Sequence, residues 1–231
     1  MKILCVADET DSLVYSSVVK SIYGDCDFVI SAGDLPLRYY DYIMTILGKD
    51  LYYVYGNHNL EQFRERMLKE DIYSQMGQRT NLIPHSGGDL VDGKCIYDKK
   101  RDLIIMGLGG SMLYNYGMSQ YSEKQMLWRI RKHIPRLLYN KKRYGRYVDI
   151  LITHAPVAGM GDGVDICHKG FECFKWFIER FSPRYLLHGH VHLFDENANR
   201  MYKYGDTTII NIYKSFIIDD PALGRSDVRK P

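Results

Sequence analysis

Several kinds of segment that mark special classes of protein are missing from this chain of 231 residues. Its longest apolar runs fall far short of the roughly 18 residues that a membrane-spanning helix needs, so the sequence predicts no membrane partner. Internal repeats, low-complexity tracts and flexible linkers are also absent. Their absence argues against solenoid, fibrous and multi-domain architectures and favours one globular domain.

The chain also lacks the cysteine patterns of secreted or metal-binding modules. Its five cysteines are an odd number and include no CxxC pair. The apolar N-terminal run is too short for a signal peptide and ends in Asp8, so it is interpreted as a first strand. Without a secretory signal, reduced thiols and a cytoplasmic location are expected. The cysteines are Cys5, Cys26, Cys95, Cys167 and Cys173.

Strong charge of either sign is missing as well. The formal net charge is only +3, and 26% of the residues are charged, which is ordinary for a globular protein. A basic segment over 129–146 is interpreted as a solvated helix face, and attraction of a polyanion is the alternative. A nucleic-acid partner is therefore not indicated by this composition.

The first part of the chain alternates between apolar runs and helix-length segments. This alternation is typical of parallel βαβ units with both sheet faces covered. We expect strands at 3–7, 28–31 and 51–55, and helices near 12–21, 37–47 and 59–70.

The middle and the end of the chain predict further strands around two helical stretches. A helix near 120–142 is expected to break at Pro135, and a second helix spans 171–181. Runs 207–212 and 216–218 are interpreted as a terminal β pair. Residues 1–218 are predicted to form a single domain, with 219–231 as a loosely ordered tail. Other strands are expected at 80–84, 94–97, 103–107, 148–152 and 184–188, with a glycine-rich loop over 107–117.

Five apolar runs each lead into a turn that carries an oxygen or imidazole ligand. Because the carboxyl ends of parallel strands meet at one edge of a sheet, these side chains are expected to converge there. Carboxylates, an amide oxygen and imidazoles together suit Mn, Fe or Zn, whereas Mg and Ca prefer oxygen alone. The runs end in Asp8, Asp34, Asn57, His154 and the segment Gly189-His190-Val191-His192.

The order of these segments resembles the calcineurin-like metallophosphoesterase superfamily. The family pattern is DxH, GD, GNH followed by D or E, H, and GHxH. This chain shows Asp8-Glu9-Thr10, Gly33-Asp34, Gly56-Asn57-His58-Asn59, Thr153-His154 and Gly189-His190-Val191-His192. The resemblance implies an α/β fold, a four-layer sandwich of two mixed β-sheets flanked by helices, with the site at the carboxyl ends of the central strands.

The resemblance also implies two divalent metal ions, Mn or Fe first and Zn as an alternative. Two such ions clamp a phosphoryl group for attack by metal-bound hydroxide. The protein would then be a metal-dependent phosphoesterase acting on a phosphomonoester or a phosphodiester. One ion would take Asp8, Asp34 and His192, and the other Asp34, Asn57, His154 and His190.

Two positions depart from the family pattern. Thr10 replaces a histidine ligand, so one metal site is expected to be weak. His58 is implied as the catalytic acid, and Asn59 stands where the family has the acid that orients this histidine. A catalytically weak or inactive scaffold that binds a partner is therefore the alternative function.

The loop after His154 supplies candidate substrate contacts. Asp162, Asp165 and His168 lie in it, and the glycines around them allow a ligand to approach the backbone closely. For the two aspartates, satisfying loop amides is an equally favoured role. Tyr114, in the glycine-rich loop, is a candidate for stacking on a substrate ring, although core packing is favoured for it.

Overall fold

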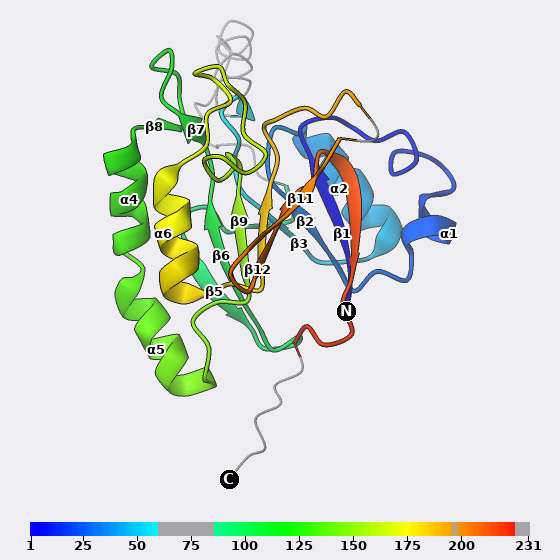
Figure 1. Cartoon of the computed structure of the whole chain (residues 1–231). Helices are drawn as coiled ribbons and strands as arrows, with labels where there is room; N and C mark the ends of the chain where they lie inside the picture. The colour runs from blue at the N-terminus through cyan, green and yellow to red at the C-terminus, as the bar shows by residue number, and fades with distance from the viewer. Residues whose placement is uncertain (60–85, 196–197, 225–231) are drawn as a thin grey trace, which may run out of the picture.

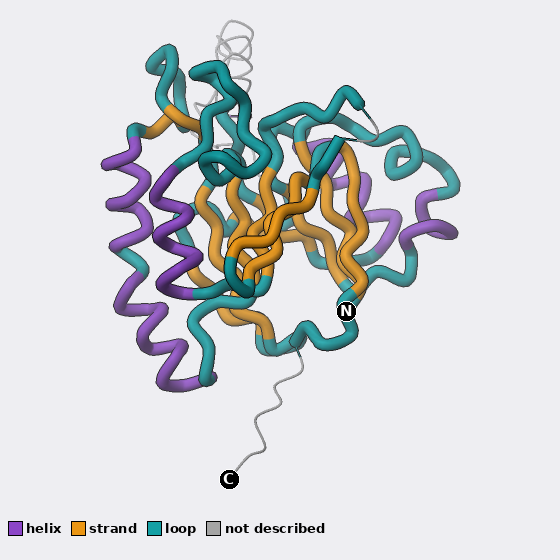
Figure 2. The backbone as a smooth tube through the Cα atoms, in the orientation of Figure 1, coloured by secondary structure: helices purple, strands orange, loops and turns teal. Residues whose placement is uncertain are grey.

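Two β-sheets lie face to face, with helices on both outer faces (Figures 1 and 2). The computed structural model describes residues 1–59, 86–195 and 198–224. Both sheets contain parallel and antiparallel pairs, which confirms the predicted mixed α/β sandwich. No described helix is long and apolar enough to cross a membrane.

The first sheet has the strand order β13-β1-β2-β3-β4. Its central strands β1, β2 and β3 are parallel, as the alternation of strands and helices predicts, and β13 pairs antiparallel with β1. The bounds are β1 Lys2–Ala7, β2 Phe28–Ser31, β3 Leu51–Tyr53, β4 Asp89–Leu90 and β13 Lys214–Asp219.

The second sheet has the order β11-β12-β10-β9-β6-β5. Strands β6, β9, β10 and β12 are parallel, and the edge strands β5 and β11 are antiparallel to their neighbours. A separate two-stranded sheet joins β7, Ser111–Met112, to β8, Gln120–Tyr121. The bounds are β5 Cys95–Asp98, β6 Leu103–Leu108, β9 Ile150–Thr153, β10 Tyr185–His188, β11 Met201–Tyr204 and β12 Thr207–Asn211.

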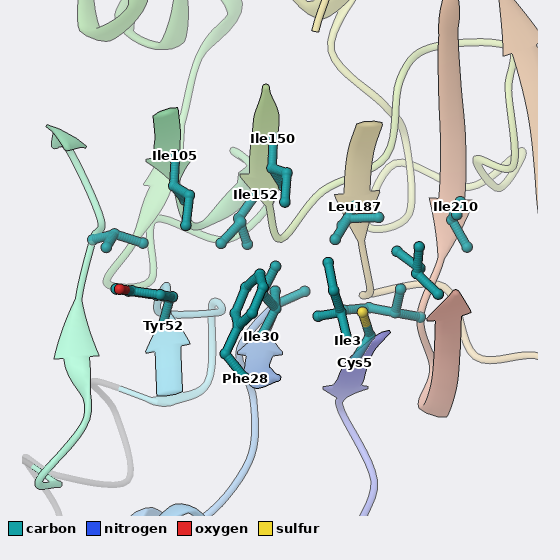
Figure 3. Packing of buried hydrophobic residues seen from close by; sticks show 14 of the residues in the cluster. Ile3, Cys5, Phe28, Ile30, Tyr52, Ile105, Ile150, Ile152, Leu187 and Ile210 are labelled. Carbon is teal, nitrogen blue, oxygen red and sulfur yellow. The ribbon is translucent and has the colours of Figure 1, made fainter. Parts of the chain in front are cut away.

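The main core lies between the sheets, and each strand contributes alternate residues to it (Figure 3). In β1, Ile3 and Cys5 face this core, whereas Leu4 and Val6 pack against the helices outside. The strands are apolar on both faces for this reason. The labelled core residues are Ile3, Cys5, Phe28, Ile30, Tyr52, Ile105, Ile150, Ile152, Leu187 and Ile210.

Five described helices form the two outer layers. Helices α1, Val19–Tyr23, and α2, Leu37–Leu47, cover the first sheet. On the second sheet, α6, Glu172–Phe181, lies beside the strands and α4, Glu123–Arg131, packs against α6 (Figure 1). Helix α5, Ile134–Tyr144, follows α4 along the same outer side.

Helix formation differs from the sequence prediction in the first part of the chain and agrees with it near Pro135. The helix expected near 12–21 is reduced to α1, because the Asp11 carboxylate accepts a hydrogen bond from Leu13 N at 2.8 Å and organises a turn instead. The helix expected near 120–142 breaks near Pro135 as predicted, which gives the two helices α4 and α5. The break precedes Pro135, which occupies the first turn of α5, where a missing N–H costs nothing.

The predicted terminal β pair is wrong. Strand β12 pairs with β10 and β11, whereas β13 crosses to the other sheet and pairs with β1. The crossing follows Tyr213, whose amide donates to the Asn211 side chain at 2.9 Å, and Lys214 then adopts a φ of 61°. This left-handed residue redirects the chain between the sheets.

Some predicted segments lie outside the described residues. These are the helix near 59–70 beyond its first residue, the strand at 80–84 and the last part of the tail, 225–231. At the described end of the tail, β13 runs through Asp219, and the Asp220 carboxylate accepts hydrogen bonds from Arg184 and Tyr185. The division into a domain and a tail remains a prediction.

Candidate metal centre

The predicted ligands follow strands that end at the same edge of the molecule. Asp8 follows β1 and His154 follows β9, although these strands belong to different sheets. The two sheets are tied together at this edge, since His190, which follows β10 of the second sheet, donates its backbone N–H to the Asp8 carboxylate at 3.0 Å. Strand ends from both sheets therefore form one polar cluster.

The backbone at this edge is unusual. Asp8, Asp34 and His190 all have positive φ, at 66°, 55° and 68°. Such left-handed residues, when they are not glycine, gather at functional sites because the surrounding structure must hold them there. Gly33, with a φ of 100°, approaches Gly56 so closely that a Cβ atom on it would lie 2.4 Å from Gly56 N.

Asp8, Asp34 and His154 form the centre of the cluster. One ligand atom from each lies within 4.8 Å of the others. His154 Nε2 lies 3.2 Å from Asp34 Oδ2 and 2.9 Å from Asn57 Oδ1. The other ring nitrogen, Nδ1, donates to the Ala32 carbonyl at 2.8 Å, which fixes the ring so that Nε2 faces the cluster.

Burial and charge shift the pKa values of these three groups. Burial raises the pKa of Asp8 to about 7. Burial also disfavours ionised Asp34 and protonated His154, but their mutual attraction outweighs it, lowering the pKa of Asp34 and raising that of His154 to about 9. Two buried carboxylates facing one imidazole need a further positive charge for balance. Their oxygen and nitrogen donors fit a divalent Mn, Fe or Zn ion.

His190 lies beside this cluster. Its ring centroid is 4.8 Å from that of His154, and only 7% of the residue is exposed. The Nε2 atom lies 2.7 Å from the Cys167 carbonyl and must therefore donate its proton there. Burial lowers the pKa of His190 to about 3, so the ring is neutral and its Nδ1 carries a lone pair that can bind a metal.

The other histidine of the GHxH segment lies elsewhere. His192 is exposed and stacks on Tyr213, with ring centroids 4.8 Å apart and an interplanar angle of 26°. Among the described residues, the metal-binding group contains Asp8, Asp34 and His154 but not His192. Stacking on Tyr213 does not occupy the ring nitrogens of His192, but in this arrangement they are not gathered with the ligand atoms of Asp8, Asp34 and His154.

His58 and Asn59 lie next to the cluster. The His58 side chain is exposed, while its backbone N–H donates to Asp34 Oδ1 at 3.0 Å. Asn59 is buried, and its Oδ1 accepts hydrogen bonds from Asp34 N at 2.8 Å and Gly56 N at 2.9 Å. These bonds hold two ligand loops together, and the expected orientation of the His58 ring by Asn59 stays a prediction.

A comparison with protein-family models matches residues 10–194 to the family described as calcineurin-like phosphoesterase. The chain belongs to this family. Membership confirms the resemblance found in the sequence. It implies a hydrolase of phosphate esters that binds divalent metal ions. No curated protein sequence matches the chain.

The solved structures that match this chain are only distantly similar to it in sequence. The crystal structure of TT1561 from Thermus thermophilus has a TM-score of 0.54 at 13% identity, covering 92% of this chain and 88% of that one. Another crystal structure gives 0.57 at 14% identity, with coverages of 92% and 90%. The phosphopantetheinyl hydrolase PptH from Mycobacterium tuberculosis gives 0.47 at 11% identity, with coverages of 92% and 88%.

The first family motif is altered in this calcineurin-like phosphoesterase. Thr10 is exposed where the family has a histidine, and Glu9 turns away from the cluster. The Glu9 carboxylate accepts a hydrogen bond from the Tyr213 hydroxyl and lies 3.3 Å from Lys214 Nζ. Glu9 is thus engaged with Tyr213 and Lys214 and does not take the place of the missing histidine.

The loop after His154 organises itself through its carboxylates. Asp162 accepts hydrogen bonds from Gly159 N at 2.8 Å and Gly170 N at 3.2 Å, so it satisfies loop amides. Asp165 Oδ2 lies 2.9 Å from His168 Nδ1. The His168 ring centroid is 5.2 Å from that of His190. Of the three predicted substrate residues, His168 with its partner Asp165 lies beside the cluster.

Tyr114 has a different role in the structure from the one that the sequence predicts. The sequence favours core packing or stacking on a substrate ring, whereas the Tyr114 hydroxyl accepts a hydrogen bond from Asn57 Nδ2 at 3.2 Å. This bond leaves Asn57 Oδ1 directed at His154 and the cluster. The only signal in the sequence is the glycine-rich loop itself, because Tyr114 lies 57 positions from its partner.

Proposed function

We propose that the protein is a divalent-metal-dependent phosphoesterase that hydrolyses a phosphomonoester or a phosphodiester. The observation that carries this proposal is the buried group of Asp8, Asp34 and His154, whose ligand atoms lie within 4.8 Å of one another at the strand ends. Family membership supports the same reaction class.

The described residues supply a sufficient ligand set for at least one ion. Asp34, Asn57, His154 and His190 would hold it, with Asp8 beside them. When bound, such an ion supplies Lewis-acid charge and lowers the pKa of a water molecule, so that water becomes a nucleophile toward phosphorus. Mn and Fe are proposed first and Zn as an alternative, because the donors are both oxygen and nitrogen.

A second ion would complete a binuclear site. It would take Asp8, Asp34 and His192, with Asp34 shared between the ions. Thr10 is exposed and His192 lies outside the group of gathered ligand atoms, so this second site has fewer ligands in place than the first. We propose that the second ion binds more weakly and is the first to be lost on dilution.

His58 is proposed as the catalytic acid. Its backbone is fixed to Asp34 and its imidazole is exposed at the rim of the cluster, within reach of an incoming ester. From this place it would donate a proton to the leaving oxygen or hydrogen-bond to the phosphoryl group. Asn59 would support it by holding the loops of Asp34 and Gly56 together.

The proposal is tested by hydrolysis of an aryl phosphodiester and an aryl phosphomonoester by metal-stripped protein. Each ester is assayed with and without Mn²⁺, Fe²⁺ or Zn²⁺. We expect metal-dependent turnover in the wild type and none in Asp34→Ala. The matched control is Asp206→Ala, an exposed aspartate between β11 and β12, which should keep the wild-type rate. If Asp34→Ala and the wild type have equal rates, the proposal is wrong.

A catalytically weak scaffold that binds a partner is the second candidate. The position of His192 outside the gathered ligand group and the exposed Thr10 favour it, because both leave one ion with fewer ligands. The two candidates differ in His58→Ala. A scaffold keeps its metal and its partner without this imidazole, whereas the phosphoesterase keeps its metal and loses turnover.

A cytoplasmic setting is part of the proposal. All five cysteines are free thiols, which supports a reducing compartment.

A further inference from the structure

Positive charge is concentrated in one segment of this chain. Residues 123–146 contain nine lysines and arginines and a single acid, Glu123, for a net charge of +8. Because the whole chain carries only +3, all other residues together carry −5. This segment forms α4 and α5, which follow one another along the outer side of the second sheet (Figure 1).

Three of the nine cations are used within the fold. Arg129 pairs with Asp92, Arg146 lies 2.8 Å from Asp149, and Lys141 Nζ donates to the Gly145 carbonyl at 2.8 Å. Glu123 is also occupied, since its carboxylate accepts the Cys173 amide at the start of α6. The other six cations of the segment are exposed and have no carboxylate partner among the described residues. They are Lys124, Arg131, Lys132, Arg136, Lys142 and Arg143.

Exposed rings alternate with these cations. Trp128 is 58% exposed and Tyr139 is 51% exposed, although large aromatic side chains are normally buried. Lys132 Nζ lies 3.3 Å from the Trp128 ring centroid, and the Arg136 guanidinium lies 5.4 Å from that of Tyr139. The segment therefore has the aromatic interleaving that a solvated helix face lacks.

A groove lies at the upper end of this face. It encloses about 380 Å³ and is lined by Tyr121, Lys124, Gln125, Trp128 and Arg129. Its walls are two rings and its rim carries amino and guanidinium groups. The Arg129 side chain lies over the Tyr121 ring at 4.3 Å, whereas Trp128 is the wall exposed to solvent.

We propose that the α4–α5 face binds single-stranded nucleic acid, with a base stacked on Trp128 in this groove and phosphates on the surrounding cations. Nucleic acid fits this face because its phosphates are complementary to the exposed cations and its flat bases fit between the aromatic rings of the groove. Single strands bind where cations track the backbone and aromatic rings stack on unpaired bases. A membrane surface needs no concave groove, and an acidic peptide needs no flat rings.

The face is linked to the proposed metal site. Tyr121 ends β8, and the loop between β7 and β8 carries Tyr114, whose hydroxyl contacts Asn57. The Tyr114 amide is held by the Gln120 side chain at 3.2 Å, so the loop is anchored to β8. Single-stranded nucleic acid bound in the groove thus lies beside a loop that walls the metal cluster. This part rests on the proposed function, since nucleic acid is itself a phosphodiester.

The test is fluorescence anisotropy of a labelled 12-nucleotide single-stranded DNA with metal-stripped full-length protein, so that binding is measured without any turnover. We expect binding at 50 mM salt that weakens steeply as salt rises. If all six cations contact phosphates, the slope of log K against log salt is about −4. Trp128→Ala should weaken binding by about 5- to 100-fold, the effect of losing one stacked base.

Charge variants separate this face from general electrostatics. The double variant Lys132→Glu, Arg136→Glu should abolish binding at 150 mM salt. The matched control, Lys20→Glu with Lys203→Glu, makes the same change in net charge on exposed lysines elsewhere and should bind like the wild type. Equal losses in both double variants would overturn the proposal.

Tryptophan fluorescence gives a second readout in the unaltered fold. The chain has only two tryptophans, and Trp128 is the exposed one. Stacking should quench its emission on addition of the oligonucleotide, and Trp176→Phe should retain this quenching. If a variant fails to fold, quenching of tryptophan emission in the wild type is sufficient to test the proposal.

Three results would reject the proposal. These are no oligonucleotide binding at 50 mM salt, binding of polyglutamate as tight as that of DNA with no effect of Trp128→Ala, and binding to vesicles of anionic lipid in place of DNA. None of them bears on the aryl ester assay, so failure here is distinct from failure of the proposed phosphoesterase.

Discussion

Acid should destabilise this protein through His188, the last residue of β10. The side chain is fully buried, its Nδ1 donates to the Gly189 carbonyl at 3.1 Å, and its Nε2 has no hydrogen-bond partner among the described residues. Protonation would place an unpaired N–H and a charge in the core. Burial accordingly lowers the pKa of His188 to about 4.

The direction and size of the effect follow from linkage. In the unfolded chain, a histidine has a pKa of about 6.5, so the unfolded state binds this proton first as pH falls. The stability contributed by neutral His188 is therefore present above pH 6.5 and is lost progressively toward pH 4. At about 1.36 kcal/mol per pKa unit, the full loss is about 3 kcal/mol, and about 2 kcal/mol of it is lost by pH 5.

The assay is urea unfolding of metal-stripped protein at pH 8 and pH 5, comparing the wild type with His188→Gln. Asp8 and His154 change in the opposite direction, because their raised pKa values favour the folded state at lower pH. Comparing the two proteins removes these contributions. The wild type should lose about 2 kcal/mol more than the variant between the two pH values.

An equal loss in both proteins would refute the reasoning. The absolute stability of His188→Gln is not the readout, since the variant also changes core packing. If it fails to fold, NMR titration of the His188 ring in the wild type replaces it, and a pKa near 6.5 would be the contradicting result.

Three further predictions concern the metal centre. His58→Ala should lower turnover by about 10²- to 10⁴-fold with Mn²⁺ affinity unchanged, as measured by ester hydrolysis and calorimetry. Asn59→Ala should lower the free energy of unfolding by about 2–4 kcal/mol, because two buried amides lose their acceptor, and Asn59→Asp should recover part of it. Tyr114→Phe should weaken Mn²⁺ binding about tenfold by releasing the Asn57 amide, whereas Tyr116→Phe, in the same loop, should not.

Much of the fold could be predicted because its signals are local. The alternation of apolar runs with helix-length segments predicts a helix near 37–47, and the structure has α2 at Leu37–Leu47. The central strands were recognised as continuous apolar runs, since both of their faces are buried. The predicted start of the first helix, near residue 12, was wrong because a hydrogen bond to the Asp11 side chain favours a turn there.

The ligand cluster could be predicted for the same reason. Asp8, Asp34 and Asn57 follow parallel strands of the first sheet, which brings such positions to one edge, and His154 comes directly after β9 of the second sheet. The sequence order of these residues was enough to assign the family, whose match spans 10–194.

The amino-acid sequence by itself determined the central strands, the chemistry of the candidate ligands and their positions at strand ends. Tertiary structure alone decided that β12 and β13 join different sheets, that His192 stacks on Tyr213, and that Tyr114 holds Asn57. In each of these cases, a strand or side chain contacts one of several possible partners that are distant from it in the sequence. Local pattern marks a residue as apolar, aromatic or polar, but the packing of both sheets determines which of several suitable partners it meets.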